Sequence, residues 1–188
     1  MDDLDGVDFV APAPSFEADF WAMCGEYQRA GERYEPSWLL PPGRDFGAYL
    51  RRLDEVREGI APLPGGVPMS VFWLVRGGVI LGTCYFRWAL TDLLRIEGGH
   101  IGYKVRPSQR RKGYGTHILE RALGLAREQE MDRVLVTCNT SNVPSARIIE
   151  KNGGRFSGEG RSPHTGKLVS RYWIDLYPTG ASRKEIRQ

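Results

Sequence analysis

The chain has 188 residues, of which 41% are hydrophobic, 26% charged and 11% aromatic, and its formal net charge is +3. This length predicts one domain with a sizeable core, and the composition argues against wholesale disorder, a collagen-like repeat and a disulfide-stapled miniprotein. No apolar run approaches the roughly 20 residues that a membrane-spanning helix needs. The acidic start of the chain also lacks the pattern of a secretory signal, so we expect a cytoplasmic protein with no membrane partner.

The cysteine and histidine residues predict neither disulfides nor a metal site. Cys24, Cys84 and Cys138 are odd in number, far apart and without a CxxC pair, which is typical of buried thiols in a reducing cytosol. Three histidines complete the set of candidate ligands, and no zinc-site spacing is present. We therefore expect no metal.

Charge is distributed unevenly along the chain. Residues 1–35 contain nine of the 23 acidic residues but only two of the 26 lysines and arginines. An acidic front and a basic remainder can present opposite fields to two different ligands. A solvated acidic helix explains the same pattern equally well.

The first 65 residues predict two helices after a short strand at about residues 7–10. Apolar residues at helical spacing predict a helix from residue 16 to about residue 33. Prolines and a glycine over residues 36–43 require a loop. A second helix is expected from Asp45, with an apolar stripe on one side.

The rest of the chain predicts the alternating strands and helices of an α/β protein. Gly77-Gly78 between two apolar runs is a hairpin signal, and a loop is expected over residues 90–97. Asn142 and Pro144 open a helix that Gly153-Gly154 close. The expected strands are 71–76, 79–88, 100–105, 133–138, 155–158 and 169–176, and the expected helices are 116–128 and 142–152.

Residues 103–116 combine a strand end, a basic glycine-rich turn and a helix start. Glycines let successive backbone amides point into one concavity, where the helix N-terminus adds its positive dipole end. Arg110, Arg111 and Lys112 add formal charge, so the segment predicts a pyrophosphate site, with a plain loop as the alternative. It contains neither GxxxxGK[ST] nor GxGxxG, which argues against Mg-ATP chemistry and a dinucleotide site.

The pattern Arg110-x-x-Gly113-x-Gly115, between a strand and a helix, resembles the acetyl-CoA loop of the GNAT superfamily of N-acetyltransferases. The following elements match too, because a strand comes next and Asn142-x-x-Ser145 then opens a helix. The strings GGHIGYKVRPSQRRKGYG and SARIIEKNGG are most similar to a little-characterised bacterial group of predicted acetyltransferases. The resemblance covers residues 71–176, most of the chain.

The resemblance implies a fold, a co-substrate and its binding residues. The fold is α/β, with a central, mostly antiparallel sheet, one splayed parallel pair and helices on both faces. The pantetheine arm of acetyl-CoA would lie in the gap between strands 99–105 and 133–138 and pair with backbone around Val105. Asn142 and Ser145 would face the pantetheine or the adenine-side phosphates, although both are also common at helix starts. The pyrophosphate would be held by the amides of Arg110, Arg111, Lys112, Gly113, Tyr114, Gly115 and Thr116.

The resemblance also implies the domain organisation. Residues 1–179 would form a single acetyltransferase domain, followed by a flexible tail at 180–188. Within the domain, residues 1–65 would form a helical region on the acceptor side, and residues 66–179 would bind acetyl-CoA.

Transfer of an acetyl group from a thioester to an amine requires a neutral amine, and a lysine-like amine has a pKa of about 10.4. The family's usual Glu falls at Gly99 here and its usual Tyr at Ile149, so both family groups are missing. Glu97 and His100 are the candidate bases. We favour His100, because histidine titrates near neutral pH and because the two preceding glycines permit a bulge that re-aims it. Two tyrosines could protonate the departing thiolate: Tyr114 and Tyr172.

The acceptor is expected to be a small-molecule or peptide amine that attacks acetyl-CoA directly in a ternary complex. Aromatic and acidic residues of the first half could form its pocket; they are Tyr34, Trp38, Phe86, Trp88, Glu32, Glu35 and Asp92. The alternative is a non-catalytic acyl-CoA-binding or regulatory module, which the missing Glu and Tyr favour. A nucleic-acid patch is the weakest interpretation; it would comprise Lys104, Arg106, Arg110, Arg111 and Lys112. We expect a monomer or a homodimer.

Overall fold

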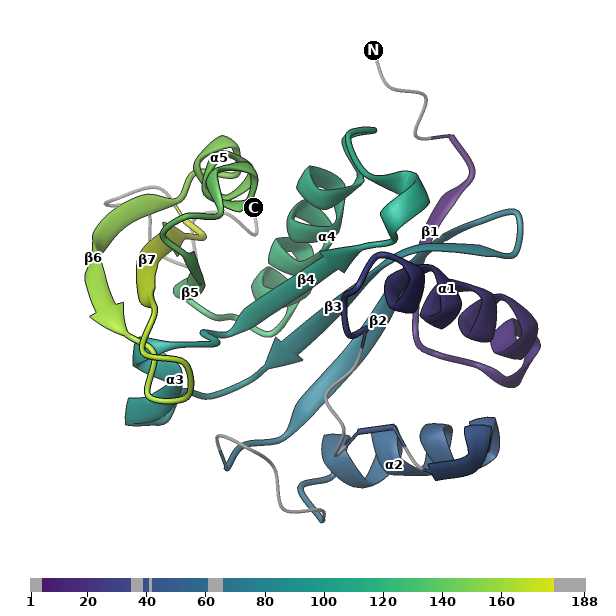
Figure 1. Ribbon diagram of the computed structural model, residues 1–188. Helices are drawn as coiled ribbons and strands as arrows, with labels where there is room; N and C mark the ends of the chain where they lie inside the picture. Colours follow the sequence, from purple (N-terminus) through teal and green to yellow (C-terminus); the bar gives the residue numbers. More distant parts are fainter. Residues whose placement is uncertain (1–4, 35–38, 41, 61–65, 178–188) are drawn as a thin grey trace, which may run out of the picture.

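A computed structural model describes residues 5–34, 39–40, 42–60 and 66–177 (Figure 1). These residues form a seven-stranded sheet in the order β1-β2-β3-β4-β5-β7-β6, and of its six strand contacts only β4–β5 is parallel. This topology confirms the expected mostly antiparallel sheet. The strands are β1 (Val7–Val10), β2 (Met69–Arg76), β3 (Val79–Arg87), β4 (Ile101–Val105), β5 (Arg133–Asn139), β6 (Arg155–Arg161) and β7 (Leu168–Asp175).

Helices cover both faces of the sheet, as expected (Figure 1). On one face α1 and α2 pack against a core that includes Phe20, Tyr49 and Trp73. On the other face α4 and α5 enclose a second core that includes Ile101 and Ile118. The described α-helices are α1 (Glu17–Arg29), α2 (Phe46–Arg57), α3 (Asp92–Ile96), α4 (Tyr114–Glu128) and α5 (Val143–Lys151). None of them is long and apolar enough to cross a bilayer.

Local sequence signals explain several of these elements. Gly77 and Gly78 have φ angles of 55° and 81°, the left-handed pair that a two-residue turn between β2 and β3 requires. Asp45 caps α2, because its side chain accepts a hydrogen bond of 2.8 Å from the amide of Ala48. The expected starts of the hairpin and of α2 are therefore confirmed.

The structure corrects three predicted boundaries. α1 ends at Arg29 rather than near residue 33, since Gly31 has a φ of 69° and cannot continue a helix. The expected loop at 90–97 contains α3, which Thr91 caps through the amide of Leu94. β6 continues past residue 158 to Arg161, with a bulge in its pairing to β7.

The first region of the chain also contributes to the sheet, because β1 pairs with β2 over its whole length. Trp38, Glu35 and the expected tail at 180–188 lie outside the described residues.

Candidate active site

The parallel strands β4 and β5 are joined at one end and diverge at the other. Their ladder in the described chain consists of the single pair Ile101–Val136. Arg87 N donates to His100 O and Arg106 N donates to Leu81 O, so the even-numbered residues of β4 make the hydrogen bonds to β3. The backbone groups of Tyr103 and Val105 therefore point away from β3, into the gap between β4 and β5.

His100 closes the joined end of this gap, which we call the apex. Its backbone amide donates to Leu135 O, and its Nδ1 accepts the Leu135 amide, both at 2.8 Å. Gly99, with a φ of 59°, comes so close to the Leu135 carbonyl that a Cβ would overlap it. The side chain of His100 thus replaces a backbone acceptor where the two strands meet.

These contacts disfavour the expected role of His100 as general base. An imidazole that accepts through Nδ1 carries its one proton on Nε2, which leaves no lone pair for a substrate proton. Burial, and next the positive charges of Arg95 and Arg87, lower the pKa of His100 to about 4. The group is therefore neutral at pH 7 and already used as an acceptor, so a structural role explains it better.

Glu97, the other candidate base, lies just beyond the apex. It follows α3 in an extended conformation, and Ser162 Oγ donates to its Oε2 at 2.5 Å. The adjacent Gly98 amide donates to Thr137 Oγ1 of β5 at 3.0 Å, which fixes the chain beside the apex. Glu97 is partly exposed, and its Oε1 has no hydrogen bond to another described residue. This carboxylate can still accept a proton.

At the open end of the gap, the turn before α4 leaves a run of backbone amides unpaired. The amide of Arg110 donates to Pro107 O and that of Thr116 to Gly113 O, so these two of the expected seven are used within the chain. Between them, five consecutive amides have no acceptor among the described residues; they belong to Arg111, Lys112, Gly113, Tyr114 and Gly115. They lie at the N-terminus of a 15-residue helix, an arrangement suited to an anion.

Two residues of the turn have left-handed backbone, Arg111 with a φ of 62° and Gly113 with a φ of 81°. Gly113 is the N-cap of α4, where such a φ favours glycine. Gly115 has a different reason, because a Cβ there would lie 2.8 Å from Ile148 Cδ1 on α5. A side chain at 115 would therefore require the end of the Ile148 side chain to move.

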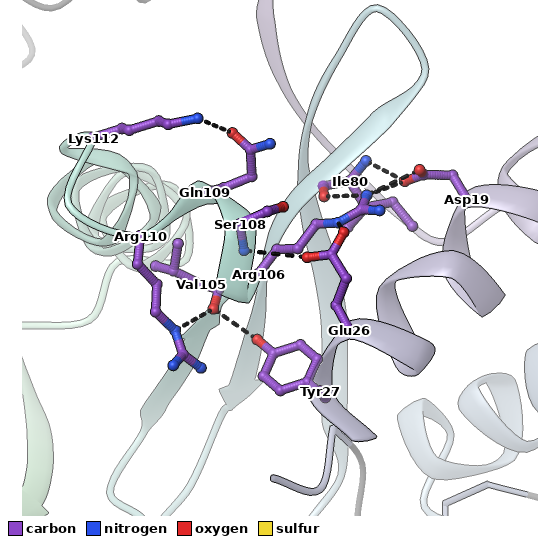
Figure 2. A network of polar contacts seen from close by, with 10 residues as sticks. All are labelled: Asp19, Glu26, Tyr27, Ile80, Val105, Arg106, Ser108, Gln109, Arg110 and Lys112. Atoms are coloured by element: carbon purple, nitrogen blue, oxygen red, sulfur yellow. Dashed lines mark hydrogen bonds and ion pairs between the residues drawn. The ribbon is translucent and has the colours of Figure 1, made fainter. Parts of the chain in front are cut away.

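The side chains of the turn contact protein groups (Figure 2). Arg110 forms a two-armed ion pair with Glu32 at 2.7 and 2.6 Å, which lowers the pKa of Glu32. Lys112 Nζ donates to Gln109, and the Val105 carbonyl accepts from Tyr27 Oη at 2.8 Å and Arg110 Nε at 3.3 Å. Val105 therefore offers the gap its amide, while its carbonyl is already bonded.

Asn142 and Ser145 lie where α5 begins, on the β5 side of the gap. Asn142 Oδ1 accepts the Ser145 amide at 3.2 Å, which confirms the helix cap. Ser145 Oγ is 2.9 Å from Tyr103 Oη of β4. This hydroxyl pair links the two sides of the gap, and sequence reasoning missed Tyr103. Tyr103 alternates with Ile101 and Val105 along the strand and so shares their face. This alternation was the signal that could have identified it.

The expected proton donors and aromatic pocket residues are largely structural. Tyr114 and Tyr172 are buried in the core under α4 and α5 with Ile149, and Arg76 donates to the Tyr114 hydroxyl. Phe86 belongs to the same core, and Trp88 packs on it with about a third of its surface exposed. Tyr34, on the opposite face, bonds Thr83 Oγ1 at 2.6 Å.

Among the described residues, no three His, Cys, Asp or Glu side chains are grouped so that they could hold a metal ion.

A family model described as an acetyltransferase (GNAT) domain matches residues 18–155. The chain therefore belongs to the GNAT acetyltransferase family. Over 59 residues it is 32% identical to a Bacillus subtilis (strain 168) protein described as the uncharacterized N-acetyltransferase YnaD. That match covers 31% of this chain and 35% of the relative, so it spans about a third of either protein.

Solved structures share the fold over nearly the whole chain. The yncA protein of Salmonella typhimurium, solved with acetyl-CoA, has a TM-score of 0.59 and 17% identity over 94% of this chain and 98% of its own. A microcin self-immunity acetyltransferase, MccE, solved with acetyl-CoA and AMP, has a TM-score of 0.65 and 12% identity over 91% and 93%. A Salmonella typhimurium acetyltransferase that modifies the N-terminal serine of a ribosomal subunit protein has a TM-score of 0.63 and 12% identity over 91% and 95%. These likenesses establish the fold.

Proposed function

We propose that this protein moves an acetyl group from acetyl-CoA to a primary amine. The observation that carries the proposal is the run of unpaired amides from Arg111 to Gly115, at the helix N-terminus beside the open end of the β4–β5 gap. A diphosphate supplies the acceptors that these five consecutive amides lack. Family membership and the acetyl-CoA complexes of the structural neighbours support the same donor.

The rest of the donor would follow the gap. The amides of Tyr103 and Val105 point into it and can pair with an extended pantetheine arm as a further strand would. Asn142 and Ser145 line its β5 side. The acetyl group would then reach the apex, near Glu97.

The reaction would be a direct attack. The amine nitrogen bonds to the thioester carbonyl carbon, the carbon–sulfur bond breaks, and sulfur leaves as the CoA thiolate. We assign the proton lost from nitrogen to Glu97, directly or through a water, since its Oε1 has no protein partner among the described residues. A thiol has a pKa of about 8.5, so the thiolate can depart without a dedicated proton donor.

A non-catalytic acyl-CoA-binding module remains the second candidate. It is favoured by Gly99 and Ile149, which place no ionisable group where the family usually has Glu and Tyr. Ile149 is fully buried in the core, so it cannot act on a ligand.

The test measures binding and turnover separately. Isothermal titration with CoA should give binding, and acetyl-CoA with a panel of amines should release free thiol. Protein N-termini come first in the panel, because one structural neighbour is described as modifying the N-terminal serine of a ribosomal subunit protein. Intersecting double-reciprocal plots are expected for direct attack, and parallel ones would refute it. Absence of CoA binding would refute the function, and binding without turnover would select the second candidate.

A further inference from the structure

An ion cluster formed by an arginine and two carboxylates of α1 lies beside the chain that enters the turn before α4 (Figure 2). At its centre is Arg106, directly after β4, with only 6% of its surface exposed. Its Nη1 donates to both carboxylate oxygens of Asp19 at 2.9 Å, and its Nε donates to Glu26 Oε1 at 2.8 Å. The acidic and basic parts of the chain therefore bind each other here, rather than presenting separate fields to two ligands.

The charges of this cluster depend on one another, because a buried charge requires partners of opposite sign. Burial alone would raise the pKa of Glu26, but hydrogen bonds from Ser108 and Arg106 hold it below its usual value. Burial alone would lower the pKa of Arg106, but the carboxylates of Asp19 and Glu26 raise it above its usual value. Arg106 is thus a cation, and Glu26 beside it is ionised near neutral pH.

Glu26 connects this ion cluster to the turn itself. While its Oε1 binds Arg106, its Oε2 accepts the backbone amide of Ser108 at 3.1 Å. Ser108 comes three residues before the first unpaired amide, that of Arg111. Arg106 therefore orients a carboxylate that in turn orients the chain entering the turn.

We propose that Arg106 is a positioning residue for the acyl donor, acting through Glu26 on the amides of residues 111–115. Its positive charge also offsets one of the two negative charges of Asp19 and Glu26, which would otherwise oppose a diphosphate nearby. This inference rests on the proposed acetyl-CoA site, and it adds a residue that touches neither the donor nor the acceptor. It also removes Arg106 from any nucleic-acid patch, since its guanidinium is enclosed by α1.

The first experiment compares Arg106→Met with Arg52→Met, which breaks a 3.0 Å ion pair on α2, far from the turn. We expect Arg106→Met to raise the KM for acetyl-CoA and the Kd for CoA roughly tenfold, with kcat and the KM for the amine unchanged. Arg106→Lys, which keeps the charge without the two-armed geometry, should recover part of this loss. Unchanged CoA affinity in Arg106→Met would overturn the proposal.

Glu26→Ala separates positioning from charge. Removing a negative charge near a diphosphate should tighten binding if only the net field matters, whereas losing the Ser108 contact should weaken it if the turn is positioned. We expect roughly tenfold weaker CoA binding; tighter or equal binding would overturn the proposal.

Amide hydrogen exchange over residues 108–117 gives a readout that needs no ligand. It should be faster in Arg106→Met and Glu26→Ala than in the parent and in Arg52→Met. If the exchange difference is present but the parent does not bind CoA, the proposed function and the donor role of Arg106 are refuted. The link from Arg106 through Glu26 to the turn would then still hold. Equal exchange in all four proteins would refute the link itself.

Discussion

The two ends of the β4–β5 gap are built in opposite ways. At the apex, a neutral histidine and a glycine join the strands, and both the amide and the carbonyl of Leu135 bind His100. At the open end, charged side chains on α1 hold the turn from outside, and five backbone amides of the turn have no acceptor among the described residues. A site can leave groups unpaired only where other contacts fix its shape. The comparison therefore predicts that variants at the apex affect folding, whereas variants at the open end affect binding.

The largest effect is expected for Gly99→Ala. The new Cβ would overlap the Leu135 carbonyl, and the φ of 59° is already unfavourable for alanine. We expect a loss of roughly 3 kcal/mol or more in the free energy of unfolding, measured by urea denaturation. Gly124→Ala is the control, because a Cβ in that part of α4 meets nothing within 4 Å and should stabilise slightly. An unchanged midpoint for Gly99→Ala would show that the apex is not tight.

Glu97→Gln should lower kcat by roughly 10²-fold with CoA affinity intact, because an amide cannot accept the proton from the amine. Steady-state kinetics together with calorimetry measure the two quantities. Ser162→Ala removes the hydroxyl that bonds Glu97 but keeps the carboxylate, so a smaller loss is expected. Full activity of Glu97→Gln would assign the proton to water alone.

His100→Ala should cost about 2 kcal/mol of folding free energy, because the buried Leu135 amide loses its acceptor. His100→Asn keeps a side-chain acceptor and should lose less. Turnover per folded molecule should fall little, since the Nδ1 lone pair of His100 is bound to the Leu135 amide. A loss of several orders of magnitude in a stable His100→Asn protein would restore the base role.

The same residue predicts how stability depends on pH. The pKa of His100 is about 4 in the folded protein and about 6.5 when unfolded, so between these values the unfolded chain binds more protons. The contribution of His100 is therefore fully present above about pH 6.5 and is lost as the pH falls towards 4. Denaturation at several pH values should show this slope in the parent and not in His100→Asn.

The smallest effect is expected for Asn142→Ala, about 1 kcal/mol for loss of the α5 cap. The KM for acetyl-CoA should also rise if Asn142 contacts the donor. Asn142→Ser keeps a capping oxygen without the amide group, so it should retain stability and still raise this KM. An unaltered KM in both variants would leave Asn142 with the cap alone.

Most of the fold could be predicted because its signals are local. Gly77-Gly78, Asp45 and Asn142 each specify a turn or a helix start through their own backbone or a hydrogen bond three residues away. The missed helix α3 shows the limit. Its five residues have too few apolar repeats to display a period, and Thr91 alone marks its start.

The same distinction between local and distant interactions applies to the candidate site. The turn before α4 is recognisable because its glycines and its place after a strand act through backbone geometry. The roles of Arg106 and Tyr103 were not predicted, because their partners, Asp19 and Ser145, lie 87 and 42 residues away. The uneven charge along the chain pointed to the contact between Arg106 and Asp19. The sequence did not indicate whether the acidic residues would be paired with a ligand or with the protein itself.

By itself the sequence determined the order of the strands and of the longer helices, that a basic glycine-rich turn precedes α4, and that the family's usual Glu and Tyr are absent. Only the tertiary structure decided which polar groups are free. It directed the lone pair of His100 to Leu135, the charge of Arg106 to α1, and the amides of Arg110 and Thr116 into the turn. The physical reason is that a hydrogen-bonding group used within the fold is lost to a ligand, and that choice depends on residues brought together from distant parts of the chain.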